Sequence, residues 1–586
     1  MSAANSIPRR LLLAAERFGS EPAYWTRGAS CWEATSWINY VGEVYAAARA
    51  LIALGFQPGQ AVGVLGFNRP EWSIMGHAAM LAGGRVAGVY WTSAPEEVDF
   101  VLNHAGCPLL LVEDATQYAK VGADGTALPA LQHTIAMRGP HIDGVMAWEE
   151  FLAYGNTSHD AEIERRLAGL TPDFIGALIY TSGTTGAPKA VALTQAALTW
   201  TADALTKALA STPNDRTISY LPLAHIAEQM VSIHAHPTGG YQMYYAKSLE
   251  TLGEHLKEVH PTIFFGVPRV WERMQKGIQD KLAAATGFKP KLARWAMGVA
   301  RRAQALRRSG QIPAGLLALQ LHVANRLILG KVRTALGLDQ ARWTYTGAAP
   351  ISEETLGFFN GLDLWMRQVY GLSETCGPTT LGVSPTTPLT SVGQALPGIE
   401  LRIADDDELL IKSPNLFSEY LGRPEATAEA LQDGWFHSGD LAKIDSQGNV
   451  FIIGRKKDIL ITSGGKNISP ANIEAALMDA PLIEHAIVCG DGRHFLSALV
   501  TLNPDVAVGL AGQSNNPNGH PAVLAAVQKA IDQVNAQHAR VANIRKFTVL
   551  DSPLSIERGE LTATLKVRRH NVIKRHEEKV KAMYDS

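Results

Sequence analysis

Residues 61–114 have the sequence AVGVLGFNRPEWSIMGHAAMLAGGRVAGVYWTSAPEEVDFVLNHAGCPLLLVED. Short runs of small and β-branched apolar residues alternate here with helical patterns. The predicted elements are strands at 61–67, 86–91 and 108–114 and helices at 69–84 and 94–106. Such alternation is typical of a mostly parallel sheet covered by helices. We therefore predict an α/β fold for the large N-terminal part of the chain.

Further along the chain, the apolar run 174–183 predicts another strand, and the pattern of 194–209 predicts the helix after it. The sequence YTSGTTGAPKAV (180–191) is therefore expected in a strand-to-helix loop, where open α/β sheets bind ligands. Its hydroxyls and glycine N–H groups can form an anion cradle, and Lys189 adds a positive charge for phosphate. The string does not fit the common GxxxxGK[ST] loop. On composition alone, an ordinary turn is the favoured explanation.

Overall composition excludes several classes of protein. With 586 residues and 46% hydrophobic content, the chain should form a multidomain globular protein. Lys plus Arg number 53 against 55 Asp plus Glu, a net charge of -2, which gives no global attraction to nucleic acid. The four cysteines are scattered, which speaks against a disulfide scaffold or zinc site and favours a reducing compartment. The apolar run near residue 10 is short for a signal peptide, so we expect a cytoplasmic protein.

The pattern changes after residue 455. A lysine-rich turn, GRKKD (454–458), precedes a stretch over 469–502 that predicts helix, strand, turn and strand, and 521–537 predicts a further helix. We therefore predict two domains, 1–455 and a smaller α+β domain, 456–586, with a hinge near Lys457.

Seven motifs occur in the order found in one superfamily. They are YTSGTTGAPKAV (180–191), YLPLAHIAE (220–228), GAAP (347–350), QVYGLSE (368–374), GWFHSGDLAKID (434–445), GRKKDILITSGGKNISPANIE (454–474) and GELTATLKVRR (559–569). On these motifs the chain resembles the adenylate-forming (AMP-binding) superfamily, which includes acyl-CoA synthetases. NRPEW (68–72), GVPRVWERM (266–274) and ELTATLK (560–566) are most similar to long-chain fatty acyl-CoA synthetases of the bubblegum type.

This resemblance implies a fold and a reaction. The fold is a large N-terminal domain that binds AMP and acyl groups, with a small mobile C-terminal cap. A medium-to-long-chain fatty acid attacks the α-phosphate of ATP, with Mg²⁺ present, to give acyl-AMP and pyrophosphate, and coenzyme A then takes the acyl group. Two alternatives stay open: a ligase that passes the acyl group to a carrier protein, and a non-catalytic acyl- or nucleotide-binding protein of the same fold.

The resemblance also implies catalytic roles. Glu374 resembles the carboxylate that holds Mg²⁺ on the ATP phosphates, which suits a hard cation. Lys566 resembles the C-terminal lysine between the attacking carboxylate and the α-phosphate, and Lys189 resembles the phosphate-binding lysine. His225 resembles a histidine near the reacting carboxylate. Because a fatty carboxylate is already ionised at neutral pH, His225 is either a positioning residue or a core histidine.

Nucleotide and coenzyme A positions follow from the same motifs. Tyr370 resembles the aromatic residue that lies against adenine, and Asp440 and Arg455 resemble the pair that binds the ribose hydroxyls. Lys457 matches the hinge position. The other positions implied are Thr181, Ser182, Gly183, Thr184, Thr185 and Gly186 for the phosphates, Gly347, Ala348, Ala349, Gly371 and Ser373 for the adenylate, and Gly464 and Gly465 for the pantetheine path.

Some positions depart from the superfamily pattern. Ala190 and Gln195 stand where the loop usually has glycine and histidine, and Glu419 replaces a frequent glycine. None of the three replaces a residue that carries charge in the reaction, so we expect them to affect rate or substrate preference.

A basic segment lies outside the motifs. Residues 276–333 contain twelve Lys or Arg against a single acidic residue, Asp280. The stretch 292–308 predicts a helix in which apolar and basic residues mix, among them Val299 and Arg307. It is either a peripheral docking face for an anionic membrane, where a fatty substrate accumulates, or a solvated basic face over the core.

Overall fold

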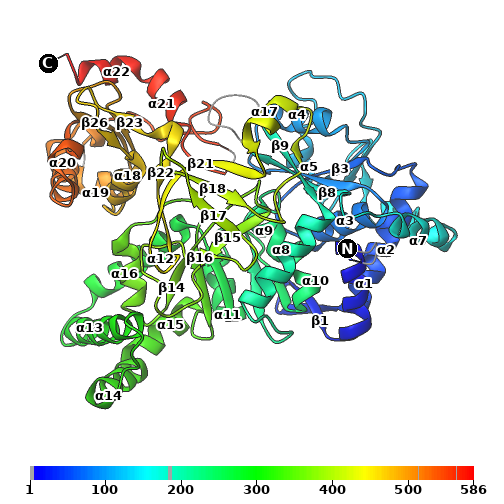
Figure 1. The fold of residues 1–586 in the computed structure, drawn as a ribbon, viewed down its shortest axis with the longest axis horizontal. Helices are drawn as coiled ribbons and strands as arrows, with labels where there is room; N and C mark the ends of the chain where they lie inside the picture. Colours follow the sequence, from blue (N-terminus) through cyan, green and yellow to red (C-terminus); the bar gives the residue numbers. More distant parts are fainter. Residues whose placement is uncertain (1–4, 182–187, 513, 563, 586) are drawn as a thin grey trace.

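The computed structural model of the chain describes residues 5–181, 188–512, 514–562 and 564–585. Figure 1 shows a large body built by most of the chain and a smaller C-terminal part, orange to red, packed beside it. The two parts have separate hydrophobic cores, and the core of the smaller part runs from Leu460 to Ile544.

An eight-stranded sheet organises the N-terminal half. Its order is β19 (Glu419–Tyr420), β9 (Lys189–Thr194), β8 (Ile175–Thr181), β4 (Arg85–Val89), β3 (Ala61–Leu65), β5 (Leu109–Val112), β6 (His133–Ala136) and β7 (Met146–Ala147). Strands β3 to β8 pair in parallel, whereas β9 and β19 pair antiparallel at one side. The strands predicted within 61–114 are confirmed, and all residues of β3 are buried, as expected for a sheet with both faces covered.

Helices complete the expected alternation. The helices beside this sheet are α2 (Trp37–Ala53), α3 (Pro70–Leu81), α4 (Pro95–Ala105) and α8 (Gln195–Ala208). Proline at the first position begins α3 and α4, and Gly106 ends α4 in the left-handed conformation. Both helices predicted within 61–114 are confirmed.

The prediction of a strand-to-helix loop at 180–191 is wrong. Residues 189–194 form β9, which pairs antiparallel with β8, so the loop joins two strands of a hairpin. The helix α8 begins only at Gln195, where Thr194 accepts a hydrogen bond from the Ala197 N–H. The four central residues of KAVALT are apolar and buried, so this segment pairs with the sheet as a strand before the helix begins.

Three further sheets complete the large part. The first contains β12 (Ile263–Gly266), β13 (Trp343–Thr346), β14 (Met366–Leu372), β15 (Gly377–Leu381) and β16 (Gln394–Ala395). The second contains β10 (Arg216–Ser219), β11 (Gln242–Tyr245), β1 (Pro22–Arg27) and β2 (Trp32–Ser36). The third contains β17 (Glu400–Ile403), β18 (Glu408–Lys412), β20 (Leu431–Gln432), β21 (Trp435–Ile444) and β22 (Val450–Arg455). The third is antiparallel throughout, so parallel pairing does not extend to the whole large domain.

Helices also surround these sheets. The basic segment contributes α12 (Pro268–Ala284), α13 (Lys289–Arg308), α14 (Gly315–Ala324) and α15 (Gly330–Leu336), and α13 confirms the helix predicted at 292–308. The remaining α-helices of the large part are α1 (Ile7–Phe18), α5 (Ala115–Tyr118), α6 (Trp148–Ala153), α7 (Asp160–Ala168), α9 (Ile226–Gln229), α10 (His236–Gly239), α11 (Leu252–Val259), α16 (Glu353–Asn360) and α17 (Pro424–Ala430).

The C-terminal part has the predicted order of elements. It contains β23 (Leu460–Ile461), β24 (Asn467–Ile468), α18 (Pro470–Met478), β25 (Ile483–Cys489), β26 (Leu496–Leu502), α19 (Pro504–Ala511), α20 (Pro521–Asn535), β27 (Ile544–Val549), α21 (Arg569–Arg575) and α22 (Glu577–Ala582). Polar contacts hold it against the large part. Arg568 donates to Glu97 at 2.6 Å, Ser352 donates to Asp479 at 2.7 Å, and Arg269 donates to the Glu484 carbonyl at 2.6 Å. These contacts fix one orientation of the small part.

Candidate active site

Two motif residues, Lys189 and Glu374, meet around Tyr420. Lys189 begins β9, Tyr420 lies on the neighbouring β19, and Glu374 follows β14. The Tyr420 hydroxyl donates to Glu374 Oε1 at 2.8 Å, and Lys189 Nζ lies 4.5 Å from the centre of the Tyr420 ring. Burial, and secondly the Glu374 charge, raises the pKa of Tyr420, so its hydroxyl remains a donor. Tyr420 thus holds the carboxylate at its edge and the ammonium over its face.

A second group forms on the antiparallel sheet. Asp440 and Arg455 lie directly opposite each other on β21 and β22, and Arg455 Nε is 2.8 Å from Asp440 Oδ1. The Tyr370 hydroxyl donates to the other oxygen, Oδ2, at 2.7 Å. Burial raises the pKa of Asp440, an effect that the Arg455 charge and the Tyr370 hydroxyl oppose. Desolvation lowers the pKa of Arg455, but the negative charge of Asp440 has the larger opposite effect, so the pKa of Arg455 lies above its usual value.

Lys566 brings the C-terminal part into the same cleft. Its backbone N–H donates to Thr562 Oγ1 at 3.0 Å, which fixes the turn that presents it. Desolvation of the ammonium, and secondly the Arg455 charge, lowers the pKa of Lys566 to about 8, while the Asp440 charge raises it. An ammonium from near the chain end therefore interacts electrostatically with residues that precede it by more than a hundred positions.

The charge of Lys566 also acts on His225. It caps α9, and its Nδ1 accepts the Ala227 N–H at 3.2 Å, so the neutral ring carries its proton on Nε2. Burial, and secondly the Lys566 charge, lowers the pKa of His225 to about 3. The ring is therefore neutral at pH 7 and can donate one hydrogen bond to an anion.

The loop before His225 is clamped by Asn68. The Asn68 amide donates to Ser219 Oγ at 2.8 Å and to the Leu221 carbonyl at 2.6 Å, and it accepts the Leu223 N–H at 3.3 Å. The side chain is almost fully buried. Such a network holds the loop in one arrangement and so fixes the position of His225.

The residues after β13 and at the end of β14 are small because the backbone of neighbouring segments lies close to them. A Cβ on Gly347 would lie 2.6 Å from the Val369 carbonyl oxygen, and one on Gly371 would lie 1.8 Å from the Gly377 carbonyl oxygen. Ala348 adopts φ +68°, which is rare for a residue with a Cβ, and both Ala348 and Ala349 are exposed. A strained, exposed turn of small residues is typical of a ligand site.

Comparison with known protein families agrees with this arrangement. Residues 13–421 match the family of AMP-binding enzymes, and residues 457–586 match the AMP-binding enzyme C-terminal domain. The chain belongs to the AMP-binding enzyme family. Among curated relatives, the long-chain-fatty-acid–CoA ligase ACSBG2 of Xenopus laevis is 34% identical, with 97% of this chain and 82% of the relative covered. The human ACSBG2 and ACSBG1 ligases are 33% and 32% identical, each over 99% of this chain and over 92% and 85% of their own lengths.

Solved structures share the family fold. The adenylation domain of a carboxylate reductase from Mycobacterium chelonae aligns with a TM-score of 0.74 at 21% identity, covering 99% of this chain and 91% of that domain. An anthranilate CoA ligase in complex with anthranoyl-AMP aligns with a TM-score of 0.74 at 17% identity, covering 99% and 100%. The adenylate-forming fold expected from the motifs is therefore confirmed.

Some positions predicted from the AMP-binding family lie apart from the cleft. Lys457 is exposed in the short connection after β22, and Gly464 and Gly465 lie on the exposed turn between β23 and β24. Among the described residues, no hydrogen bond joins these three to Lys189, Glu374 or Lys566. Thr181 ends β8 and donates to the Lys189 carbonyl at 3.4 Å, and Ser373 is buried beside Glu374. The predicted phosphate ligands Ser182, Gly183, Thr184, Thr185 and Gly186 lie outside the described residues.

Two departures from the AMP-binding family pattern are explained by the core. Gln195 is fully buried, and its Oε1 accepts the Ile7 N–H at 2.9 Å, which ties α1 to the start of α8. Ala190 is buried within β9. Neither side chain faces the cleft residues, so their differences from the family pattern concern packing.

The donor set suits one kind of metal. Among residues 5–181, 188–512, 514–562 and 564–585, no three His, Cys, Asp or Glu gather as a metal cluster. Glu374 uses one carboxylate oxygen for Tyr420 and keeps the other. A site of one carboxylate completed by substrate phosphates and water fits Mg²⁺, which rarely uses an all-protein cage.

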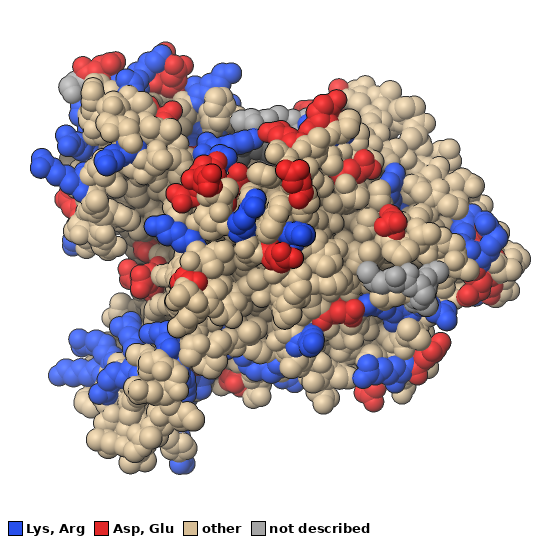
Figure 2. Space-filling view, in the orientation of Figure 1, with Lys and Arg blue, Asp and Glu red and all other residues tan. Residues whose placement is uncertain are grey.

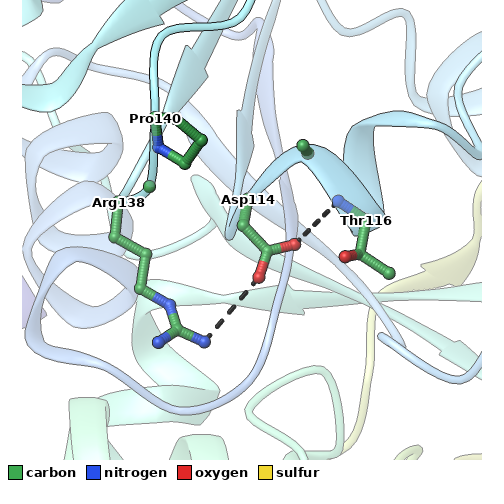
Figure 3. A pocket seen from close by; sticks show the side chains of 6 residues that line it. Asp114, Thr116, Arg138 and Pro140 are labelled. Atoms are coloured by element: carbon green, nitrogen blue, oxygen red, sulfur yellow. Dashed lines mark hydrogen bonds and ion pairs between the residues drawn. The ribbon is translucent and has the colours of Figure 1, made fainter.

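A separate surface hollow does not belong to this group. It has a volume of about 390 Å³ and lies after β5 and β6, where Arg138 approaches Asp114 at 3.7 Å (Figure 3). Asp114 also accepts the Thr116 N–H at 3.0 Å and so caps α5, and Glu113 holds Arg138 at 2.6 Å. These charges already have protein partners, so we assign the hollow no ligand.

Sequence reasoning missed three of the residues that organise the site. Tyr420 belongs to FSEYLG, where only Glu419 drew attention, and the strand pairing of β19 with β9 had no signal in the sequence. Asn68 belongs to NRPEW, which indicated a subfamily but no contact. Glu97 lies in the first turn of α4, where acidic residues are common, and nothing in the sequence indicated its contact with Arg568.

Proposed function

We propose that this protein is an ATP-dependent long-chain fatty acid–CoA ligase. The observation that carries the proposal is the group of Tyr370, Asp440 and Arg455, in which Asp440 lies within hydrogen-bond distance of the other two and on which the charge of Lys566, from the C-terminal part, acts. A site that collects a neutral histidine, an ammonium and a ribose-type carboxylate–guanidinium pair suits attack of an ionised acid on a nucleotide phosphate. The relatives named as long-chain-fatty-acid–CoA ligases support a fatty acid as the substrate.

In the first step, an acid oxygen forms a bond to the α-phosphorus of ATP while the bond to pyrophosphate breaks. Lys566 places its positive charge between the acid and the α-phosphate, where negative charge gathers. His225 donates its Nε2–H to the acid and orients it, since no base is needed for an ionised carboxylate. Mg²⁺, held by Glu374 and the phosphates, would neutralise charge on the departing pyrophosphate.

The nucleotide would lie along the strand ends. Tyr370 and the turn at Gly347, Ala348 and Ala349 would contact adenine, and Asp440 with Arg455 would bind the ribose. Gly371 and Ser373 would line the same side. Lys189 would meet the phosphates together with the loop from Thr181 to Gly186.

In the second step, the coenzyme A thiol attacks the acyl carbonyl and AMP leaves. Residues 1–455 and 456–586 would act as the two moving domains, with Lys457 at the hinge and Gly464 and Gly465 along the pantetheine arm. The exposure of these glycines on the turn between β23 and β24 supports a rotation that exchanges the lysine for the glycine turn at the acyl-adenylate.

The acceptor is tested by supplying alternatives to one enzyme. The protein is incubated with ATP, Mg²⁺ and palmitate together with either coenzyme A or a phosphopantetheinylated acyl carrier protein, and products are identified by mass spectrometry. The proposal predicts palmitoyl-CoA and no acylated carrier protein. Acyl-AMP that is consumed only by the carrier protein would identify the other kind of ligase, and absence of acyl-AMP in both mixtures would indicate a binding protein.

The basic segment 276–333 is part of the same proposal. It would bring the ligase to a membrane surface, where long-chain fatty acids partition. Among the described helices, none combines the length and apolar character needed to cross a bilayer. Contact through this segment would therefore be peripheral.

A further inference from the structure

The helices α13 and α14 form a hairpin at the periphery of the large part, at the lower left of Figure 1. In Figure 2 the tip at the position of α14 is almost entirely uncharged, and Lys and Arg side chains gather beside it at the position of α13. Apolar and basic surfaces are thus adjacent at one protruding edge of the molecule.

The apolar face of α13 is occupied by the core. Ala293, Ala296, Val299, Ala300 and Ala303 are buried, and Val299 packs in the cluster that includes Trp271 and Phe359. Its other large apolar residues are less buried: Leu292, Met297 and Leu306 are half-buried and Trp295 is 37% exposed. Of the two alternatives for 292–308, the buried Val299 agrees with a basic face over the core, because this helix packs its apolar side chains against the protein interior.

The following helix has the opposite arrangement. Large apolar side chains recur every three or four residues from the loop before α14 to the π-helical turn after it, and within the helical residues this spacing places them on one face. They are Ile312 (88% exposed), Leu316 (70%), Leu319 (61%), Val323 (37%) and Leu327 (43%). We name these five residues the α14 stripe. An exposed contiguous apolar stripe is uncommon on a globular protein and marks an interaction surface.

The charged residues of the hairpin itself have a single sign. From residue 281 to residue 338 the chain contains no Asp or Glu. Arg294, Arg301, Arg302, Arg326 and Lys331 form no ion pair within the described chain, and all five are exposed. Arg307 differs, because it binds Asp363 at 2.7 Å and so belongs to the fold.

We propose that the α14 stripe inserts into the surface of an anionic lipid bilayer while the flanking arginines and lysines bind lipid headgroups. An apolar helix face bordered by unpaired cations is complementary to a surface with acyl chains below and negative charge at the headgroups. A second copy of the chain is a poorer occupant, because a two-fold contact would bring the same cations against each other. The inference rests on the proposed function in one respect, since a fatty substrate gives the enzyme a reason to be at a bilayer.

The test is flotation of the full-length protein with vesicles in a density gradient. One set of vesicles is phosphatidylcholine alone, and the other contains about one-third phosphatidylglycerol. The stripe variant is Leu316→Asp/Leu319→Asp, and the matched control is Val508→Asp/Leu510→Asp on α19, whose side chains are 51% and 44% exposed. The charge variant is Arg294→Glu/Arg326→Glu.

Wild type and the α19 control should float with the anionic vesicles. The stripe variant should lose at least about tenfold in partitioning, since two leucines no longer enter the acyl region. The charge variant should lose affinity for the anionic vesicles, because each basic residue near such a surface strengthens binding about fivefold. Equal flotation of wild type and stripe variant would overturn the proposal, as would a wild type that floats with neither set. A dimer that the stripe variant abolishes, without flotation, would assign the face to a second copy and also overturn it.

Two activity measurements separate this inference from the proposed function. With decanoate, which is delivered in solution, the stripe variant should release pyrophosphate at the wild-type rate. With palmitate supplied in the anionic vesicles, the stripe variant should be slower than wild type and the α19 control. Failure of wild type to act on either acid would overturn the proposed function while leaving the flotation result to decide the membrane surface.

Discussion

Replacement of Lys566 provides a quantitative test of the site. Desolvation of the ammonium and the positive charge of Arg455 lower the pKa of Lys566 to about 8. Only the protonated ammonium can stabilise the charge between acid and α-phosphate. Adenylation by wild-type protein should therefore lose rate as the pH rises through about 8, and kcat/KM should fall about tenfold for each further pH unit.

Two substitutions at this position have opposite consequences. In Lys566→Ala the charge is absent at every pH, and we expect adenylation to fall about 10²- to 10³-fold, or about 3–4 kcal/mol in barrier height. In Lys566→Arg the charge persists far above pH 8, because a guanidinium does not deprotonate in this range. The longer guanidinium alters the geometry and should lower the rate at pH 7, and the alkaline fall in kcat/KM should move upward by more than one pH unit.

The assay is acid-dependent pyrophosphate release from ATP and Mg²⁺, measured from pH 6 to 10 under kcat/KM conditions. Lys529→Ala on α20 is the control, since it changes a lysine that is exposed on the same domain. Thermal unfolding of each variant shows that the fold is retained. An alkaline fall that stays at pH 8 in Lys566→Arg, or Lys566→Ala protein with wild-type adenylation, would refute the reasoning.

Three further predictions concern single contacts. Glu374→Gln should raise the Mg²⁺ concentration needed for half-maximal activity at least about tenfold, because an amide binds a hard cation poorly; an unchanged Mg²⁺ titration would contradict this. Asp440→Asn removes the charged partner of Arg455, 2.8 Å away, and should raise the KM for ATP about ten- to a hundredfold, with a KM equal to wild type as the contrary result. Glu97→Arg and Arg568→Glu should each slow adenylation up to about fivefold, and the double exchange should restore the rate if the 2.6 Å pair holds the domains together; a double variant slower than both singles would argue against it.

Local sequence predicted the elements that have clear periodicity. Strands β3, β4 and β5 and helices α3 and α4 follow from alternation of buried apolar runs with helical patterns. Strand β9 was missed because six residues, four of them apolar, carry too little pattern between a loop and a helix to be distinguished from either. Its assignment depends on pairing with β8, which is a tertiary contact.

The site residues, too, could be named from the sequence, whereas their contacts depend on tertiary structure. Motif order placed Asp440, Arg455 and Lys566 in one active site, but their spacing along the chain carries no distance. The contact of Asp440 with Arg455 depends on the register of β21 and β22, and that of Tyr420 with Glu374 depends on the approach of two sheets. The spacing of the α14 stripe is visible in the sequence, yet periodic apolar residues ordinarily predict a buried face. Its exposure could be established only from the packing of the whole molecule.

The central claim is a two-step ligase reaction, and pyrophosphate release tests it most directly. Wild-type protein is mixed with ATP, Mg²⁺ and each of a series of saturated fatty acids, with and without coenzyme A. The account predicts an acid-dependent burst stoichiometric with enzyme when coenzyme A is absent, and continuous turnover with formation of acyl-CoA when it is present, fastest with long chains. Absence of acid-dependent release, or turnover that coenzyme A does not change, would contradict it.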